Sequence, residues 1–121
     1  MFQSNGSNIT VCEAFILTGR DKGLTEKHIN KCFTYNIYLD DYYIIVYYKG
    51  PQTNFDSTWE SYKDDIVNCS YDTRWQIDKT KGLEDFSKKF FNVKAFRIAK
   101  SIHNTQKSVY HLMIDLSDYV S

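Results

Sequence analysis

The sequence has little proline and alanine, and it lacks the motifs that mark most enzymes and metalloproteins. Its 121 residues include one proline and three alanines, whereas isoleucine, lysine, asparagine and tyrosine are abundant. Such usage is typical of AT-rich coding genomes, as in a phage, another mobile element, a low-GC bacterium or a large DNA virus. No phosphate-binding G-x-x-x-x-G-K-[ST] or G-x-G-x-x-G and no G-x-S-x-G nucleophile elbow occurs.

The cysteines are too few and too scattered for a zinc site. Cys12, Cys32 and Cys69 form no C-x-x-C and no Cys/His ligand spacing, so we expect neither a metal nor another cofactor. An odd count in a chain long enough to fold without staples favours a reducing compartment. We expect Cys12 and Cys32 to act as small buried apolar side chains.

The sequence also lacks a long apolar run. None approaches the roughly 20 residues that a membrane-spanning helix needs, and the first residues show no basic stretch followed by an apolar core. We therefore expect a cytoplasmic protein with no membrane partner. The length fits one domain covering residues 1–121, of which the polar residues 1–7 are expected to be disordered.

The hydrophobic pattern predicts an α+β fold. We expect a mainly antiparallel sheet of about six strands, with two or three helices packed on one face. The expected strands are residues 8–18, 32–39, 42–48, 71–77 and 108–116, and the expected helices are residues 25–31, 57–67 and 83–92. Residues 93–102 can prolong the last helix or form a sixth strand, and we favour the strand. In these last two strands we expect Phe96, Ile98, Ile102, Tyr110, Leu112, Ile114 and Leu116 to face inward.

The stretch Tyr35–Tyr48 is the strongest single signal, because it holds six of the ten tyrosines. It predicts a central β-hairpin with Asp40-Asp41 as its turn. One face of such a hairpin suffices for the core, so Tyr38, Tyr43 and Tyr47 are expected on the other. These tyrosines either cover the sheet or lie half-buried under a helix, or they form a protein-binding surface, where tyrosine is enriched.

Candidate catalytic groups are few. His103 and His111 flank the last hairpin loop, and two histidines with a nearby lysine can cleave RNA by general acid–base catalysis. The alternative is that both are ordinary loop and strand residues. The carboxylate pairs Asp40-Asp41 and Asp64-Asp65 do not converge, since adjacent residues point in different directions. We therefore expect no enzyme, with a small ribonuclease as an alternative.

Charge is balanced overall but unevenly spread. An acidic cluster includes Asp56, Glu60 and Asp64, and we expect it to join the three tyrosines in binding a partner. The segment between residues 79 and 107 is basic, with aromatic residues among its charges, as in single-strand binders. Its candidate nucleic-acid contacts are Lys88, Lys89, Lys94, Arg97 and Lys100. A near-neutral isoelectric point opposes that reading.

Small size, reduced thiols and the lack of catalytic motifs favour a protein that acts by binding. The leading hypothesis is a non-enzymatic inhibitor or immunity-type protein that neutralises a toxin, nuclease or defence factor through its surface. The alternative is a nucleic-acid-binding accessory protein of a phage or mobile element. An exposed edge strand would also permit a homodimer.

Overall fold

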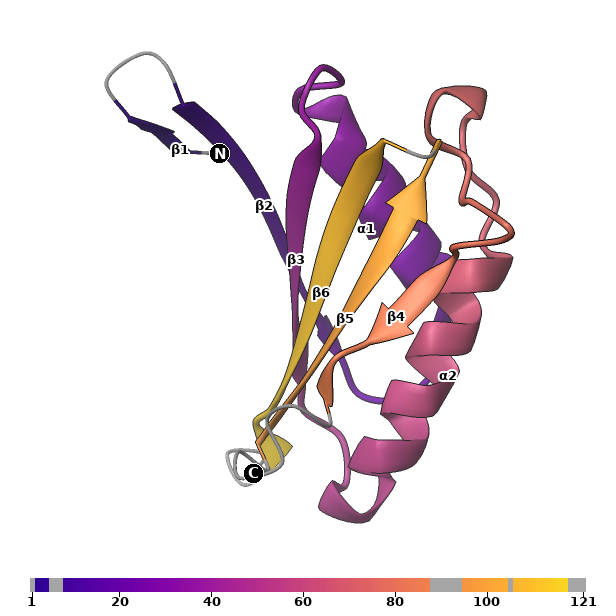
Figure 1. The fold of residues 1–121 in the computed structure, drawn as a ribbon. Coiled ribbons are helices and arrows are strands. Elements are labelled where there is room, and N and C mark those ends of the chain that lie inside the picture. The colour runs from indigo at the N-terminus through magenta and orange to yellow at the C-terminus, as the bar shows by residue number, and fades with distance from the viewer. Residues whose placement is uncertain (1, 5–7, 88–94, 105, 118–121) are drawn as a thin grey trace.

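The computed structural model describes residues 2–4, 8–87, 95–104 and 106–117, and these form a two-layer α+β fold. One layer is a twisted sheet and the other consists of two helices on the same side of it (Figure 1). The elements are β1 (Phe2–Ser4), β2 (Asn8–Leu17), α1 (Lys22–Thr34), β3 (Asp41–Tyr48), α2 (Phe55–Asn68), β4 (Leu83–Asp85), β5 (Phe96–His103) and β6 (Lys107–Asp115), with short 3-10 turns at Gln52–Asn54 and Thr73–Trp75. No helix in the described ranges is long and apolar enough to cross a membrane.

The sheet is mixed, which corrects the expectation of a mainly antiparallel one. Its strand order is β1-β2-β3-β6-β5-β4. The central pairs β2/β3 and β3/β6 are parallel, whereas β5/β6, β4/β5 and β1/β2 are antiparallel. β1 lies within the segment 1–7 that we expected to be disordered, and residues 1 and 5–7 lie outside the described residues.

The central hairpin expected at residues 32–48 is wrong. Residues 32–34 end helix α1, residues 35–40 form a loop, and only Asp41–Tyr48 is a strand. The helix begins at Lys22 because Asp21 caps it, its carboxylate accepting a hydrogen bond from the backbone N–H of Leu24 at 3.0 Å. A helical crossover leads from β2 to β3, and such a connection makes the two strands parallel.

The helix α2 confirms the expected helix at residues 57–67 and extends it at both ends. Its stripe of Trp59, Tyr62 and Ile66 is buried as expected. Ser57 does not cap it. The helix begins before Ser57, whose hydroxyl donates to the carbonyl of Asn54 at 3.1 Å.

Two further expectations between residues 71 and 92 are corrected. Residues 71–77 form a 3-10 turn and one isolated bridge, Ile77 to His103, rather than a strand. Tyr71, Trp75 and Ile77 are nevertheless buried, which produced the alternating pattern. Leu83–Asp85 is a strand and not the start of a helix, and the rest of the expected helix, from residue 88, lies outside the described residues.

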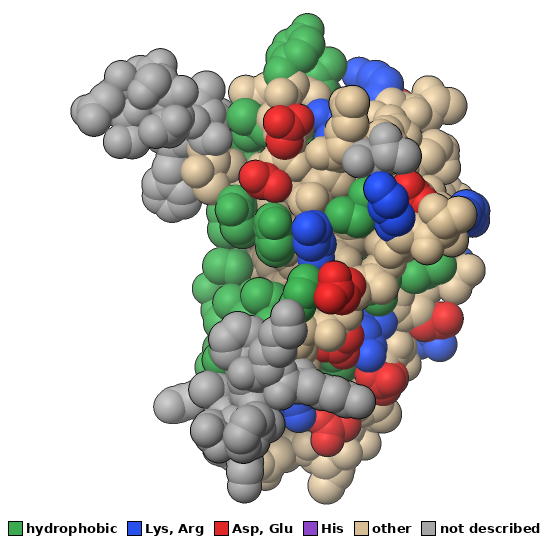
Figure 2. Space-filling view, viewed as in Figure 1, with side chains coloured by type: hydrophobic (Ala, Val, Ile, Leu, Met, Phe, Trp, Pro, Cys, Tyr) green, Lys and Arg blue, Asp and Glu red, His purple; other side chains and the backbone are tan. Residues whose placement is uncertain are grey.

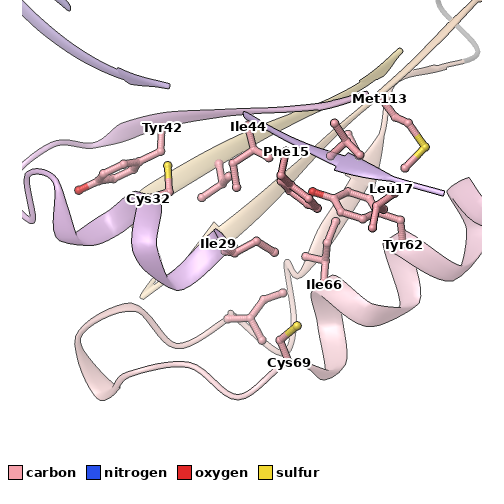
Figure 3. Close-up of a cluster of buried hydrophobic side chains, with 14 of the residues drawn as sticks. Phe15, Leu17, Ile29, Cys32, Tyr42, Ile44, Tyr62, Ile66, Cys69 and Met113 are labelled. Atoms are coloured by element: carbon pink, nitrogen blue, oxygen red, sulfur yellow. The ribbon is translucent and has the colours of Figure 1, made fainter. Parts of the chain in front are cut away.

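The last two strands confirm the preferred interpretation of residues 96–102 as a strand, and the hairpin that follows, but their inward faces are reversed; residues 93 and 94 lie outside the described residues. Ala99, Ser101 and His103 of β5 face the helices, as do Val109, His111 and Met113 of β6. The core lies between this side of the sheet and the two helices. Figure 3 shows Ile29 of α1 and Tyr62 and Ile66 of α2 lying beneath Phe15 and Ile44 of the sheet, with Cys32 beside Tyr42.

Candidate interaction surface

The side of the sheet away from the helices carries an apolar surface, which we call the open face. Strand register arranges its side chains in three rows that run across four strands. The rows are Cys12–Tyr43–Tyr110–Lys100, Ala14–Ile45–Leu112–Ile98 and Ile16–Tyr47–Ile114–Phe96. Lys100 is the one charged residue in this set. Figure 2 shows hydrophobic side chains gathered along this side of the sheet, opposite α1 and α2.

An open groove of about 410 Å³ crosses the first two rows. Its lining comes from β2, β3, β6 and β5, including Cys12, Ile45, Leu112 and Ile98. Tyr43 is 40% exposed, and Ile16, in the third row, is 49% exposed. Large exposed aliphatic and aromatic side chains that share one face are typical of interaction sites rather than of ordinary surface.

The polar end of the open face is a stacked row. The rings of Tyr43 and Tyr110 lie nearly parallel, with centroids 5.3 Å apart. The ammonium of Lys100 lies 5.7 Å from the centroid of the Tyr110 ring, within cation–π range. Rings held in this way have little side-chain entropy left to lose on binding, which suits them to an interface.

The strand directions make the bare face unusual. Sheets built from parallel strands are normally covered on both sides. Here β2, β3 and β6 run parallel at the centre, and α1 and α2 cover one side only. In the described part of the chain no helix covers the other side.

The three tyrosines expected to share a surface are only partly brought together. Tyr43 and Tyr47 both lie on the open face of β3, in its first and third rows, with Ile45 between them. Tyr38 lies in the loop between α1 and β3, where it is 87% exposed, and is not part of any strand. The alternation of apolar residues from Phe33 to Leu39 predicts a strand there, which is why the sequence groups Tyr38 with the other two.

The acidic residues lie on the helix layer, on the opposite side of the molecule from the tyrosines. Asp56, Glu60 and Asp64 are spaced by four residues along α2, all exposed. Each has a cationic partner: Arg97 at 2.8 Å for Asp56, Lys63 at 2.6 Å for Glu60 and Arg20 at 3.1 Å for Asp64. The acidic row is therefore only partly compensated within the fold, because Arg20 also binds Asp65 and Lys63 also binds Asp85, and it is not continuous with the open face.

The basic residues proposed as nucleic-acid contacts are also dispersed. Arg97 extends toward the helix layer, where it pairs with Asp56 and lies 5.1 Å from the centroid of the Phe55 ring. Lys100 lies on the open face. Lys88, Lys89 and Lys94 lie outside the described residues.

The two histidines considered for catalysis are fully buried on the helix side of β5 and β6. Ser101 lies between them, with its hydroxyl 2.9 Å from Nε2 of each imidazole. Nδ1 of His111 is 2.7 Å from the Tyr62 hydroxyl, and Nδ1 of His103 is 2.9 Å from the carbonyl of Trp75. All four ring nitrogens thus have partners inside the fold, and neither ring faces a groove.

The number of hydrogens on each group fixes the donor and the acceptor of every hydrogen bond in this buried network of Trp75, His103, Ser101, His111 and Tyr62. A carbonyl only accepts, so His103 donates from Nδ1 to Trp75 and, being neutral, accepts from the Ser101 hydroxyl at Nε2. The single Ser101 hydrogen is then used, so His111 donates from Nε2 to the Ser101 oxygen. His111 Nδ1 in turn accepts from the Tyr62 hydroxyl.

Burial keeps the side chains of this hydrogen-bonded network uncharged. It lowers the pKa of His103 to about 4 and that of His111 to about 3, and the neighbouring His103 lowers the latter further. Burial also raises the pKa of the Tyr62 hydroxyl well above its usual value, so the tyrosine keeps its proton. The arrangement satisfies buried polar groups and stabilises the core, and it offers no acid or base to a substrate.

The cysteines and the remaining polar side chains suggest no further site. Cys32 is buried, as expected, and burial raises its pKa to about 12. Cys12 is only partly buried, on the open face. Among the described residues no cluster of three or more His, Cys, Asp or Glu side chains is placed to hold a metal ion.

The residues that sequence reasoning missed are three aliphatic residues and one tyrosine of the open face. Ile45, Ile98, Tyr110 and Leu112 form its centre. Strand β6 is apolar or aromatic at nearly every position from Val109 to Ile114, which indicates burial or contact on both sides. That pattern could have indicated from the sequence that both sides of β6 are apolar.

Comparison with protein-family models, curated proteins and solved structures found no match to this chain.

Proposed function

We propose that this chain is a non-enzymatic protein-binding protein of the inhibitor or immunity type, and that it binds through the open face. In this proposal it neutralises a toxin, a nuclease or a defence factor by covering part of that protein. The observation that carries the proposal is the apolar, uncovered side of a sheet whose central strands are parallel. A partner that lies on this side supplies the missing layer and buries the three rows.

The chemistry of the open face indicates what kind of partner it fits. Eleven of its twelve side chains carry no charge, and the tyrosines keep polar hydroxyl groups at its margin. Aromatic and aliphatic side chains that become fully desolvated provide most of the binding energy in protein interfaces. We therefore expect the partner to present an apolar helix or strand surface rather than a basic groove.

Replacing Leu112 by Glu tests the surface. Leu112 lies in the middle row, so a carboxylate there would be buried unpaired on binding. With the partner protein first isolated by affinity purification on the unmodified chain, we expect its dissociation constant, measured by calorimetry, to rise about 100-fold, the change that a hot-spot loss near 3 kcal/mol produces. Because Leu112 is only partly buried in the free chain, circular dichroism should show an unchanged fold.

The matched control is Glu60→Lys on the helix layer. Glu60 is exposed and lies in the acidic row that the sequence suggested as a contact. We expect this variant to bind with unchanged affinity. If Glu60→Lys abolishes binding and Leu112→Glu does not, the helix layer is the binding surface and the open face is not.

A nucleic-acid-binding role is the second candidate, and one observation favours it. Tyr43, Tyr110 and Lys100 form an aromatic row with a cation at its end, as in proteins on which bases stack. If this role is correct, a mixed-sequence single-stranded oligonucleotide binds at low salt, and Tyr110→Ala weakens that binding about tenfold. Fluorescence anisotropy without saturable binding at low salt would eliminate it. The apolar rows beside the tyrosines lead us to expect that outcome.

A further inference from the structure

Strand β2 has a long free edge. Its first residues, Asn8–Thr10, pair with β1, and its other side pairs with β3 from Val11 to Leu17. Within the described residues no strand pairs with the outer edge of Val11–Leu17. The opposite edge of the sheet, β4, is only three residues long. Natural sheets rarely leave a seven-residue edge open, because unpaired backbone groups recruit another strand.

The direction of one carbonyl shows which backbone groups are free. The carbonyl of Leu17 accepts from the N–H of Lys49, just beyond β3, at 2.8 Å, so Leu17 directs its polar groups toward β3. Backbone direction alternates along a strand. Cys12, Ala14 and Ile16 therefore direct their N–H and C=O groups outward, and their side chains belong to the open face.

We propose that a second copy of this chain occupies the edge, its β2 pairing antiparallel to the first about a two-fold axis at Ala14. β1 limits the free stretch on one side and the end of β2 limits it on the other, so its midpoint is Ala14. In this register Ala14 lies opposite Ala14, and Cys12 lies opposite Ile16 of the second copy. On the open face each small side chain meets a small or medium one, and no charge meets a charge.

The helix side of the edge is equally compatible. There Glu13 lies opposite Phe15 of the second copy, so no like charges face each other. The Glu13 carboxylate is already compensated within its own chain, by Lys31 Nζ at 3.7 Å and by the Tyr35 hydroxyl, which donates to it at 3.4 Å. Pairing joins the two sheets into one and makes the two open faces continuous. The dimer does not depend on the proposed protein partner.

A cross-link that uses the native Cys12 tests the register. Opposed residues of a hydrogen-bonded antiparallel pair have Cα atoms about 5.5 Å apart, which is a typical disulfide separation. In Ile16→Cys the new thiol lies opposite Cys12 of the second copy. We expect mild oxidation to convert most of this variant into a covalent dimer on non-reducing electrophoresis. The double variant Cys12→Ser/Ile16→Cys should give no covalent dimer, because in this register the two introduced thiols are four positions out of alignment.

Sedimentation equilibrium completes the test. The unmodified chain should sediment as a dimer, at about twice its 14.3 kDa mass. Ala14→Pro should sediment as a monomer with unchanged circular dichroism, since proline removes only an N–H that points to the free edge. A monomeric unmodified chain would overturn the proposal. So would a dimer that Ala14→Pro leaves intact, or one in which Ile16→Cys fails to cross-link through Cys12.

Discussion

Lowering the pH from 7 to about 4 is expected to destabilise this protein strongly, because its two buried histidines bind protons far less readily in the folded state than in the unfolded one. Both have pKa values below the unfolded value near 6.5, at about 4 for His103 and about 3 for His111. Above pH 6.5 the two histidines are neutral in both the folded and the unfolded state, so they do not lower the free energy of unfolding. Below it the unfolded chain binds two protons that the folded chain excludes, so stability falls by about 3 kcal/mol per pH unit. The total free energy of unfolding of a small domain is only about 5–15 kcal/mol.

The measurement is urea denaturation at a series of pH values between 7 and 4, with NMR titration of the imidazole protons. We expect the free energy of unfolding to decline steadily across that range, and the His103 and His111 signals of the folded state to stay at their neutral positions between pH 7 and about 5. Asp85 adds to this loss only below about pH 4, since its contacts with Lys63, Ser87 and Trp59 hold its folded-state pKa at about 2 and its stabilising effect is complete above that range. Titration of either imidazole near pH 6.5 in the folded protein would contradict the buried hydrogen-bond chain.

Replacing Phe33 by Ala is expected to cost about 4 kcal/mol of folding free energy. The Phe33 ring is fully buried at the end of α1. Its centroid lies 4.7 Å from that of Tyr42, 4.9 Å from that of His103 and 5.1 Å from that of Trp75. Truncation removes all of these contacts and leaves a cavity, and buried Phe-to-Ala changes typically cost about 3–5 kcal/mol.

The matched variant is Tyr35→Ala, two residues further along. Tyr35 is 43% exposed, just beyond the helix, and its hydroxyl makes one long hydrogen bond to Glu13. We expect Tyr35→Ala to lower the free energy of unfolding by about 1 kcal/mol or less. In the hairpin that the sequence suggested, both residues would share a face and their costs would be similar. Chemical denaturation of the two variants therefore distinguishes the two folds, and equal losses would refute helix α1 as described.

The helix expected at residues 25–31 is confirmed within α1, and the difference between the expected strand and the observed helix end and loop at residues 32–39 shows where the pattern misled. Thr25, Ile29, Cys32 and Phe33 form the buried stripe of a helix, whereas alternate residues from Phe33 to Leu39 imitate a strand. The imitation arises because the loop after α1 is itself partly apolar, and Ile37 and Leu39 pack against the core. Local periodicity cannot distinguish a strand from a loop that covers a core, so tertiary contacts decided this segment.

The existence of β5 and β6 was predictable, but their orientation was not. Tyr110, Leu112 and Ile114 are at least as apolar as Val109, His111 and Met113, so hydrophobicity favours the wrong side. The buried side contains His103, His111 and Ser101, which are tolerated because each satisfies the hydrogen bonds of the next. Such mutual compensation depends on Tyr62 and the Trp75 carbonyl, which lie far away in sequence.

The candidate surface was predictable in part. Tyr43 and Tyr47 lie on the uncovered side, where the alternation of β3 placed them, and their role in binding stays a prediction. The acidic row could be found as a cluster, but its pairing with Arg97, Lys63 and Arg20 joins residues up to 44 positions apart. Compensation of charge over such separations depends on the fold and leaves no trace in local sequence.

The strand order has a consequence for how the chain reaches its folded state during synthesis. β6 lies between β3 and β5 and forms hydrogen-bonded pairs with both of them. A ribosome makes residues 41–48 long before residues 107–115. The edge of β3 that pairs with β6 therefore stays unpaired until β6 has been synthesised. Pairings that join distant segments form slowly and expose apolar strands meanwhile. The nascent chain is therefore expected to depend on chaperones, and a chain arrested before residue 107 should remain unfolded.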